Sequence, residues 1–199
     1  SIYCIKTVKG DKVIKEEIYN NFVFDFSRIL REKIQNLEIS KLIFLCIGTD
    51  RVIGDSYGPL VGYKLKYLFN DKENVEVFGE LGNVVTANNI EKIIKYINNK
   101  YETPFIIAID ASFTNKNNVG SIKVSENGLI VRSGLSSKGI CVGNISIKGV
   151  VSKDLNKPQY NFRLLQNTPL GFIMNMAECT AYGIYNVINV LYNNAFYCK

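Results

Sequence analysis

The sequence LIFLCI, residues 42–47, gives the clearest indication of the fold of this chain. Every position is apolar, Lys41 precedes the run and Gly48 follows it, and apolar and polar residues do not alternate. Such a run is typical of a strand buried on both faces, as in a parallel sheet. The sequence FIIAI at residues 105–109 has the same character and is followed directly by Asp110. We therefore predict two central parallel strands, each ending just before a polar segment.

Helices are predicted on either side of these two runs. Apolar residues recur at helical spacing in several segments, and Thr86 is a suitable N-cap for one of them. The predicted helices cover residues 16–37, 58–69, 86–98 and 170–192.

Further strands complete the predicted sheet. Short strands are expected at residues 75–78 and 144–151, and a surface loop at residues 133–143. Residues 119–124 and 129–132, joined by Ser-Glu-Asn-Gly, are predicted to pair as a β-hairpin. Alternating strands and helices indicate an α/β fold. We expect one domain over residues 1–199: three layers, a mostly parallel sheet with helices on both faces, and a β-hairpin insertion.

The chain contains no histidine, which limits its chemistry. Catalytic systems that pair serine or cysteine with histidine are excluded, and so are metal sites that need an imidazole ligand. Acid–base chemistry must use Asp, Glu, Lys, Tyr or Cys. The five cysteines are scattered and form no Cys-x-x-Cys pair, so neither a disulfide framework nor a zinc site is indicated. We expect neither a cofactor nor a metal.

The net charge of +6 comes from Lys and Arg residues spread along the whole chain. This spread is typical of a solvated surface, so we expect no direct nucleic-acid partner. Nucleic-acid binding is kept as a minor alternative because of the charge and the twelve tyrosines. No apolar run is long enough to cross a membrane, and residues 1–15 lack the apolar core of a signal peptide. A cytoplasmic protein without membrane contact is expected.

Polar residues follow both central strands. Right-handed crossovers place the carboxyl ends of parallel strands at one edge of the sheet, where ligands bind. Asp55 follows the first strand and Asp110 follows the other, so the two are expected to meet there. The alternatives are structural: Asp55 could cap the following helix, and Asp110 could begin a turn.

Other residues of the same edge are candidates for shaping the site or binding substrate. Three glycines in the first loop permit tight turns and close backbone approach: Gly48, Gly54 and Gly58. Tentative substrate-binding residues are Asp50, Arg51, Glu80 and Asn83.

Two adjoining carboxyl groups would not both ionise readily, so one would keep a proton. The ionised member could activate a water molecule, and the protonated member could donate to a substrate. This chemistry needs neither histidine nor a metal.

Several motifs resemble the YyaC family of proposed spore proteases. The most specific is C-I-G-T-D-R-x-x-G-D-x-x-G-P-L-V-G at residues 46–62. Shorter matching segments are I-A-I-D-A, G-S-I-K-V, G-N-I-S-I-K-G-V-V and L-Q-N-T-x-L, at residues 107–111, 120–124, 143–151 and 165–170. That family is related to the germination protease of spore-forming bacteria and, more distantly, to hydrogenase maturation peptidases.

The resemblance implies an α/β fold of the phosphorylase/hydrolase-like type and peptide-bond hydrolysis. It also implies a sporulating cell or spore as the setting, and small spore proteins as substrates. Asp55 and Asp110 match the aspartates of the germination protease. In hydrogenase peptidases the matching carboxylates bind nickel together with a histidine, which has no counterpart here.

Two functions are therefore weighed. The first is a sporulation-associated endopeptidase that uses Asp55 and Asp110 without a metal. The second is a non-catalytic factor of the sporulating cell that binds a peptide or protein on the same fold.

Overall fold

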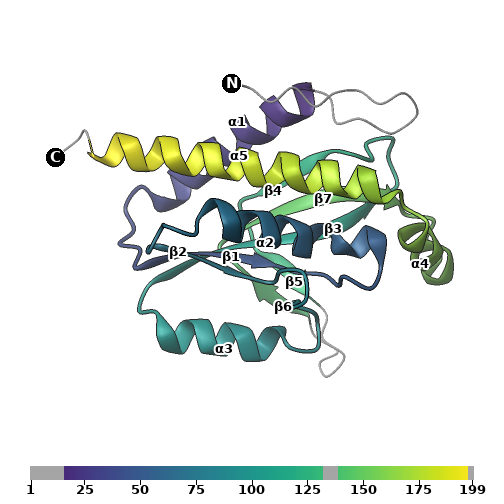
Figure 1. The fold of residues 1–199 in the computed structure, drawn as a ribbon, viewed down its shortest axis with the longest axis horizontal. Helices are drawn as coiled ribbons and strands as arrows, with labels where there is room; N and C mark the ends of the chain where they lie inside the picture. The colour runs from purple at the N-terminus through teal and green to yellow at the C-terminus, as the bar shows by residue number, and fades with distance from the viewer. Residues whose placement is uncertain (1–15, 132–138, 197–199) are drawn as a thin grey trace.

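A five-stranded sheet forms the centre of the molecule, which is a computed structural model describing residues 16–131 and 139–196 (Figure 1). The strand order is β2-β1-β3-β7-β4. Strands β2, β1, β3 and β7 are parallel, and β4 is antiparallel to β7. The bounds are β1 Lys41–Cys46, β2 Val75–Phe78, β3 Pro104–Thr114, β4 Ile122–Ser125 and β7 Ile145–Lys153. The predicted α/β class with a mostly parallel sheet is confirmed.

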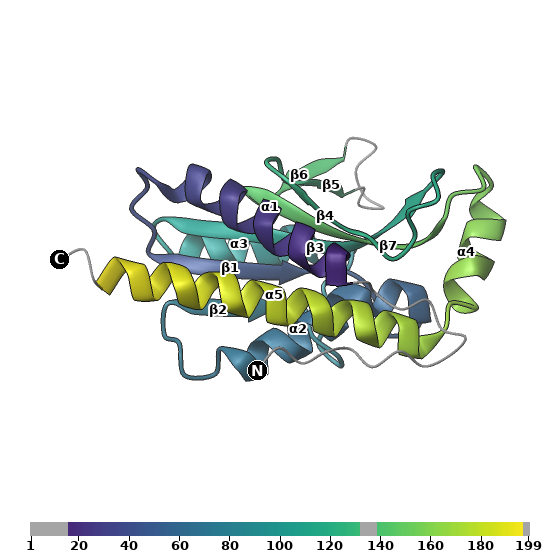
Figure 2. The same ribbon diagram turned by 90° about the horizontal axis from the view of Figure 1, so that it is seen from above.

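Helices cover both faces of this sheet, as the two views show (Figures 1 and 2). One face packs against α1 (Glu16–Ile34), α2 (Tyr57–Leu68) and α5 (Leu170–Phe196). The other face packs against α3 (Ile90–Lys100) and a small second sheet, β5 (Leu129–Val131) with β6 (Ile140–Val142). The side chains of β1 alternate between these two cores, which explains why the run at 42–47 is apolar at every position.

Strand β3 continues past the point where the sequence predicted its end. Its ladder with β1 ends at the pair Cys46–Ile109, but its ladder with β7 continues to Thr114. Asp110 therefore lies inside β3, opposite Lys148, and the prediction that it follows the strand is wrong. Beyond β1, pairing with β7 alone keeps the polar residues of β3 extended.

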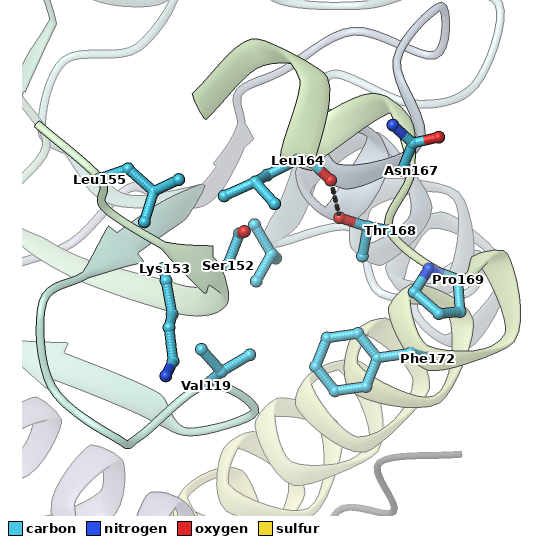
Figure 3. A pocket seen from close by; sticks show the side chains of 10 residues that line it. Val119, Ser152, Lys153, Leu155, Leu164, Asn167, Thr168, Pro169 and Phe172 are labelled. Atoms are coloured by element: carbon cyan, nitrogen blue, oxygen red, sulfur yellow. Dashed lines mark hydrogen bonds between the residues drawn. The ribbon is translucent and has the colours of Figure 1, made fainter. Parts of the chain in front are cut away.

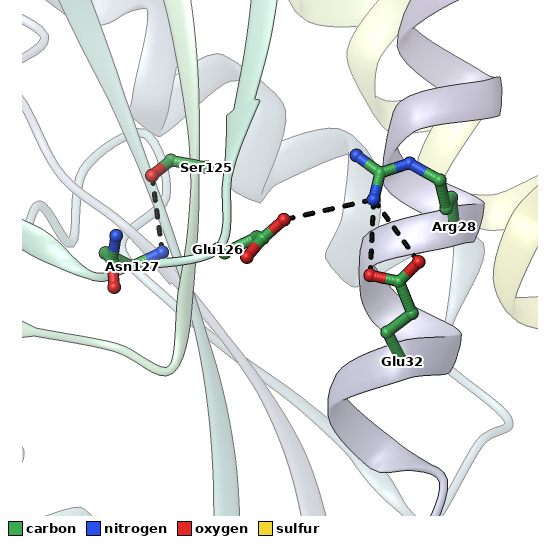
Figure 4. A network of polar contacts seen from close by, with 5 residues as sticks. All are labelled: Arg28, Glu32, Ser125, Glu126 and Asn127. Carbon is green, nitrogen blue, oxygen red and sulfur yellow. Dashed lines mark hydrogen bonds and ion pairs between the residues drawn. The ribbon is translucent and has the colours of Figure 1, made fainter.

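The predicted β-hairpin between residues 119–124 and 129–132 is wrong. Strand β4 pairs with β7, and β5 pairs with β6 in the second sheet. The Ser-Glu-Asn-Gly segment crosses from one sheet to the other. Its Glu126 lies 3.9 Å from Arg28 of α1, and its Ser125 hydroxyl accepts a hydrogen bond from the Asn127 amide (Figure 4). The two predicted strands thus pair in different sheets, β4 with the nine-residue β7 and β5 with β6.

Other boundaries also differ from the predictions. Helix α3 begins at Ile90, with Asn89 as its N-cap, because Thr86 lies in a preceding turn where its carbonyl accepts the Ile90 amide. Helix α4 (Pro158–Gln166) was not predicted, and residues 140–142, expected in a loop, form β6. The predictions for residues 1–15 and for residues 132–138 lie outside the described residues. Within the described ranges, no helix has the length and apolar character to cross a membrane.

Candidate active site

The candidate site lies where the direction of the chain through the sheet reverses. From β1 the chain passes to β2 on one side, and from β3 it reaches β7 on the other. In open α/β sheets this switch point, outside the carboxyl ends of the strands, is where ligands bind. The segment after β1 contains Asp55, within the short 3-10 helix η1 (Ile53–Ser56), and β3 contains Asp110. The fold therefore brings both predicted aspartates to this edge.

Asp55 is partly buried and fixed by the loop that contains it. The Thr49 amide donates to the Asp55 carboxylate at 3.2 Å and to the Asp55 carbonyl at 3.1 Å. Removal from water raises the pKa of Asp55 to about 6, and the Thr49 hydrogen bond partly offsets this. Helix α2 has Ser56 as its N-cap, without a side-chain capping bond. The alternative that Asp55 serves to cap α2 is therefore not supported.

Asp110 is partly buried, and the negative charge of Asp55 acts on its carboxyl group. Its pKa is raised to about 7, first by removal from water and second by the nearby negative charge of Asp55. The Ala111 amide and the Lys148 ammonium act in the opposite direction. The carboxyl group of Asp110 thus holds a proton at a pH at which an ordinary aspartate is ionised.

Close packing of backbone holds the loop of Asp55 in place. An added Cβ on Gly48, which has φ of +142°, would collide with the Asp55 carbonyl oxygen. A Cβ on Gly58 would collide with the Ile47 carbonyl oxygen, and one on Gly54 would lie 2.5 Å from the Leu165 side chain of α4. All three predicted glycines therefore permit close contacts around the site, and side chains at these positions would displace the loop.

Tyr57, a buried residue that was not predicted to belong to the site, packs against the strand and helix behind the loop of Asp55. Tyr57 is fully buried, and its ring fills the space left by the missing side chain of Gly149 on β7. Its hydroxyl lies 2.7 Å from Thr180 Oγ1 of α5, and the Thr180 hydroxyl itself donates to Met176 O at 2.9 Å. Tyr57 therefore acts as the donor to Thr180. In the sequence, the aromatic residue two positions after Asp55 in the motif G-D-S-Y-G-P-L was the feature that could have indicated Tyr57.

The tentative substrate-binding residues lie in two loops at the carboxyl edge of the sheet: Asp50 and Arg51 in the loop after β1, and Glu80 and Asn83 in the loop after β2. Asp50 accepts the Gly82 amide at 2.9 Å, which ties the loop after β1 to the loop after β2. Glu80 forms an ion pair with Lys66 of α2, so its charge is already matched. Asn83 and Arg51 are exposed. A role in substrate binding stays a prediction for these four residues.

The α/β fold of this chain is also found in a solved structure of another protein. The structure is similar to a [NiFe] hydrogenase maturation protease, HycI from Thermococcus kodakarensis KOD1. The TM-score is 0.51 at 17% identity, over 81% of this chain and 99% of that chain. The catalytic domain of the N-acetylmuramoyl-L-alanine amidase CwlV from Bacillus (Paenibacillus) polymyxa var. colistinus matches 77% of this chain and 99% of its own, with 11% identity and a TM-score of 0.38. The HycI match shows a shared α/β fold.

Residues 14–183 match the model of one family, described as "Protein of unknown function (DUF1256)", and the chain belongs to this family. It is 35% identical over 156 residues to YyaC of Bacillus subtilis (strain 168), described as an uncharacterized protein. The match covers 78% of this chain and 74% of that protein. The resemblance to the YyaC family is thereby confirmed, while the spore-protease role stays a prediction.

The nickel site known from hydrogenase peptidases does not fit the residues present here. The chain has no histidine to complete the ligand set. Across residues 16–131 and 139–196, no three His, Cys, Asp or Glu side chains are grouped so that they could hold an ion. What Asp55 and Asp110 do provide is two carboxyl groups whose pKa values are both raised by removal from water.

Proposed function

We propose that this protein is an endopeptidase that hydrolyses peptide bonds with Asp55 and Asp110. One observation carries the proposal: the topology brings two carboxyl groups from separate β-α units to the switch point, where the charge of Asp55 raises the pKa of Asp110. Pairs of titratable groups whose environments set different pKa values, about 6 and about 7 here, are typical of acid–base catalysts.

Each carboxyl group has a distinct role in the proposed reaction. Asp55, with the lower pKa, is the ionised member and removes a proton from a water molecule. The water oxygen then attacks the carbonyl carbon of the scissile peptide. Asp110, with the higher pKa, supplies its proton to the leaving amide nitrogen as the carbon–nitrogen bond breaks. Asp55 gains one proton from water and Asp110 gives one to the amine. The pair therefore still holds one proton when the reaction ends.

The biological setting is also proposed, on the basis of the motifs shared with the germination protease. We place the protein in the cytoplasm of a sporulating cell or spore, with small spore proteins as substrates. The motifs around Asp55 and Asp110 support this setting because they are the segments that match the protease. Neither a metal nor a cofactor is needed for the proposed reaction.

The test is cleavage of a random-sequence peptide mixture, read by mass spectrometry. The unchanged chain is compared with Asp55→Asn, Asp110→Asn and the control Asp25→Asn, an exposed aspartate of α1. We expect cleavage by the unchanged chain and the control, and a loss of at least about 100-fold in each site variant.

Two results would count against the proposal. Cleavage that survives both site substitutions would show that the aspartates are not the catalysts. No cleavage by the unchanged chain, combined with saturable peptide binding that both substitutions leave intact, would favour the non-catalytic binding factor.

A further inference from the structure

A pocket of about 430 Å³ lies at the carboxyl end of β7 (Figure 3). Its volume is within the range of ligand sites in proteins, roughly 300–1,000 Å³. The apolar lining comes from four separate parts of the chain: Val119, Val151, Leu155, Leu164, Pro169 and Phe172. Such a cavity is suited to one large apolar group.

Ser152 contributes a hydrogen-bonding group that has no partner. The residue is 8% exposed, and it lines the pocket beside Leu164 and Lys153 (Figure 3). Among the described residues, its hydroxyl has no hydrogen bond, whereas the hydroxyl of buried Thr168 donates to the Leu164 carbonyl at 2.7 Å. Within the described residues the one buried side-chain polar atom without a partner is Ser121 Oγ, so the Ser152 hydroxyl stays accessible from the pocket. Ser152 is therefore positioned to bind a polar atom of whatever occupies the pocket.

Lys153 adds a positive charge that is not matched within the described residues. Its side chain lines the same pocket, yet none of the ion pairs or side-chain hydrogen bonds of the described chain involves it. The neighbouring Asp154 carboxylate is instead held by Asn161 and the Asn156 amide. A carboxylate on the ligand would complement Lys153, and the net charge of +6 would favour its approach.

Two elements, β7 and α4, contribute residues both to the pocket and to the surroundings of the aspartates. Strand β7 places Lys148 opposite Asp110 and, four residues further along, Ser152 in the pocket. At about 3.3 Å per residue this separation is roughly 13 Å, the span of four residues of extended peptide. Helix α4 is the second shared element. Its Leu165 packs against Gly54, next to Asp55, and its Leu164 lines the pocket.

We propose that this pocket is a recognition subsite for acidic peptides, which insert a large apolar side chain while a flanking carboxylate pairs with Lys153. The Ser152 hydroxyl bonds the peptide main chain. The assignment as a substrate subsite rests on the proposed peptidase function, and it places the inserted side chain about four residues from the cleaved bond.

Binding is tested separately from cleavage, with the Asp110→Asn chain. The probe is a rhodamine-labelled peptide with a central phenylalanine flanked by glutamates, followed by fluorescence anisotropy. Matched probes replace the phenylalanine with alanine, or the glutamates with lysines. The protein variants are Lys153→Glu, Leu164→Trp, which fills the pocket, and Lys95→Glu, an exposed control on α3 with the same change in charge.

We expect Lys153→Glu, Leu164→Trp and both altered probes to weaken binding about tenfold or more, and Lys95→Glu to change it less than about twofold. Absence of binding by the glutamate–phenylalanine probe would overturn the inference, as would equal affinity in Lys153→Glu and Lys95→Glu chains. Binding with the expected pattern, but no cleavage by the unchanged chain, would uphold the subsite and defeat the proposed peptidase function.

Discussion

Replacing Asp110 with asparagine should make the protein more stable at neutral and alkaline pH. In the unfolded chain this carboxyl group loses its proton near pH 3.8, whereas the folded protein keeps it to about pH 7. Between these values the folded state holds more protons, so stability falls as the pH rises through the interval. Above about pH 7, the ionised Asp110 lowers the free energy of unfolding by a constant amount. Below about pH 4 the group is neutral in both states and contributes nothing.

The size of the gain follows from the same interval. The difference between 3.8 and about 7 corresponds to at most about 4 kcal/mol. The carboxyl group keeps some contact with solvent, and asparagine leaves the Ala111 amide with a weaker acceptor, so we expect a gain of about 2 kcal/mol at pH 8. In a chain of this size that raises the melting temperature by about 4–8 °C.

Thermal unfolding of the two chains at about pH 8 and about pH 4 measures this effect, with Asp25→Asn as the control for loss of one negative charge. The difference between Asp110→Asn and the unchanged chain should be present at the higher pH and vanish at the lower. An equal difference at both values, or a loss of stability at the higher one, would refute the reasoning that burial and Asp55 destabilise the ionised Asp110.

Three further predictions concern the site and its support. The kcat/KM of peptide cleavage should show a bell-shaped pH dependence with its maximum between about pH 6 and about pH 7, because one carboxyl group must be ionised and the other protonated. A profile that is flat from about pH 5 to 8 would contradict the proposed mechanism. Gly149→Ala should cost about 1–3 kcal/mol in urea unfolding, since the new Cβ would lie 2.5 Å from the Tyr57 ring, whereas Gly171→Ala, with open space around it, should cost nothing measurable. Tyr57→Phe should cost about 1 kcal/mol by removing the 2.7 Å hydrogen bond to Thr180, and a Thr180→Val change should add little to it; full additivity of the two costs would show that the bond contributes no stability.

The central sheet could be predicted from the sequence because its strands are covered on both faces. The run at residues 42–47 is buried between two cores, so every position had to be apolar. Residues 75–78 form β2 with the predicted bounds. The pairing of β4 and β5 could not be predicted, because local turn chemistry favoured a hairpin while long-range pairing with β7 and β6 prevailed.

Helix α4 is short and none of its residues is fully buried, so its apolar pattern, carried by half-buried Leu164 and Leu165, gave a weak signal. Pro158 in its first turn was the other local signal.

The position of the aspartates could be predicted, but their surroundings could not. Topology alone was enough to place Asp55 and Asp110 at one edge of the sheet. That Lys66 matches the charge of Glu80 depends on how α2 lies against the loop after β2. The pocket is built from residues 119, 151–155, 164 and 167–172, which only the folded chain brings together.

The parallel ladder between β1 and β3 has a consequence for how activity could arise during folding. The two strands are joined by a long crossover that includes α2, β2 and α3, and such non-local pairings form slowly. Until that ladder closes, Asp55 and Asp110 belong to two independent chain segments with ordinary acidity. If the proposed peptidase activity holds, a partly folded molecule has no catalytic pair, which would protect the nascent chain and its neighbours from premature cleavage.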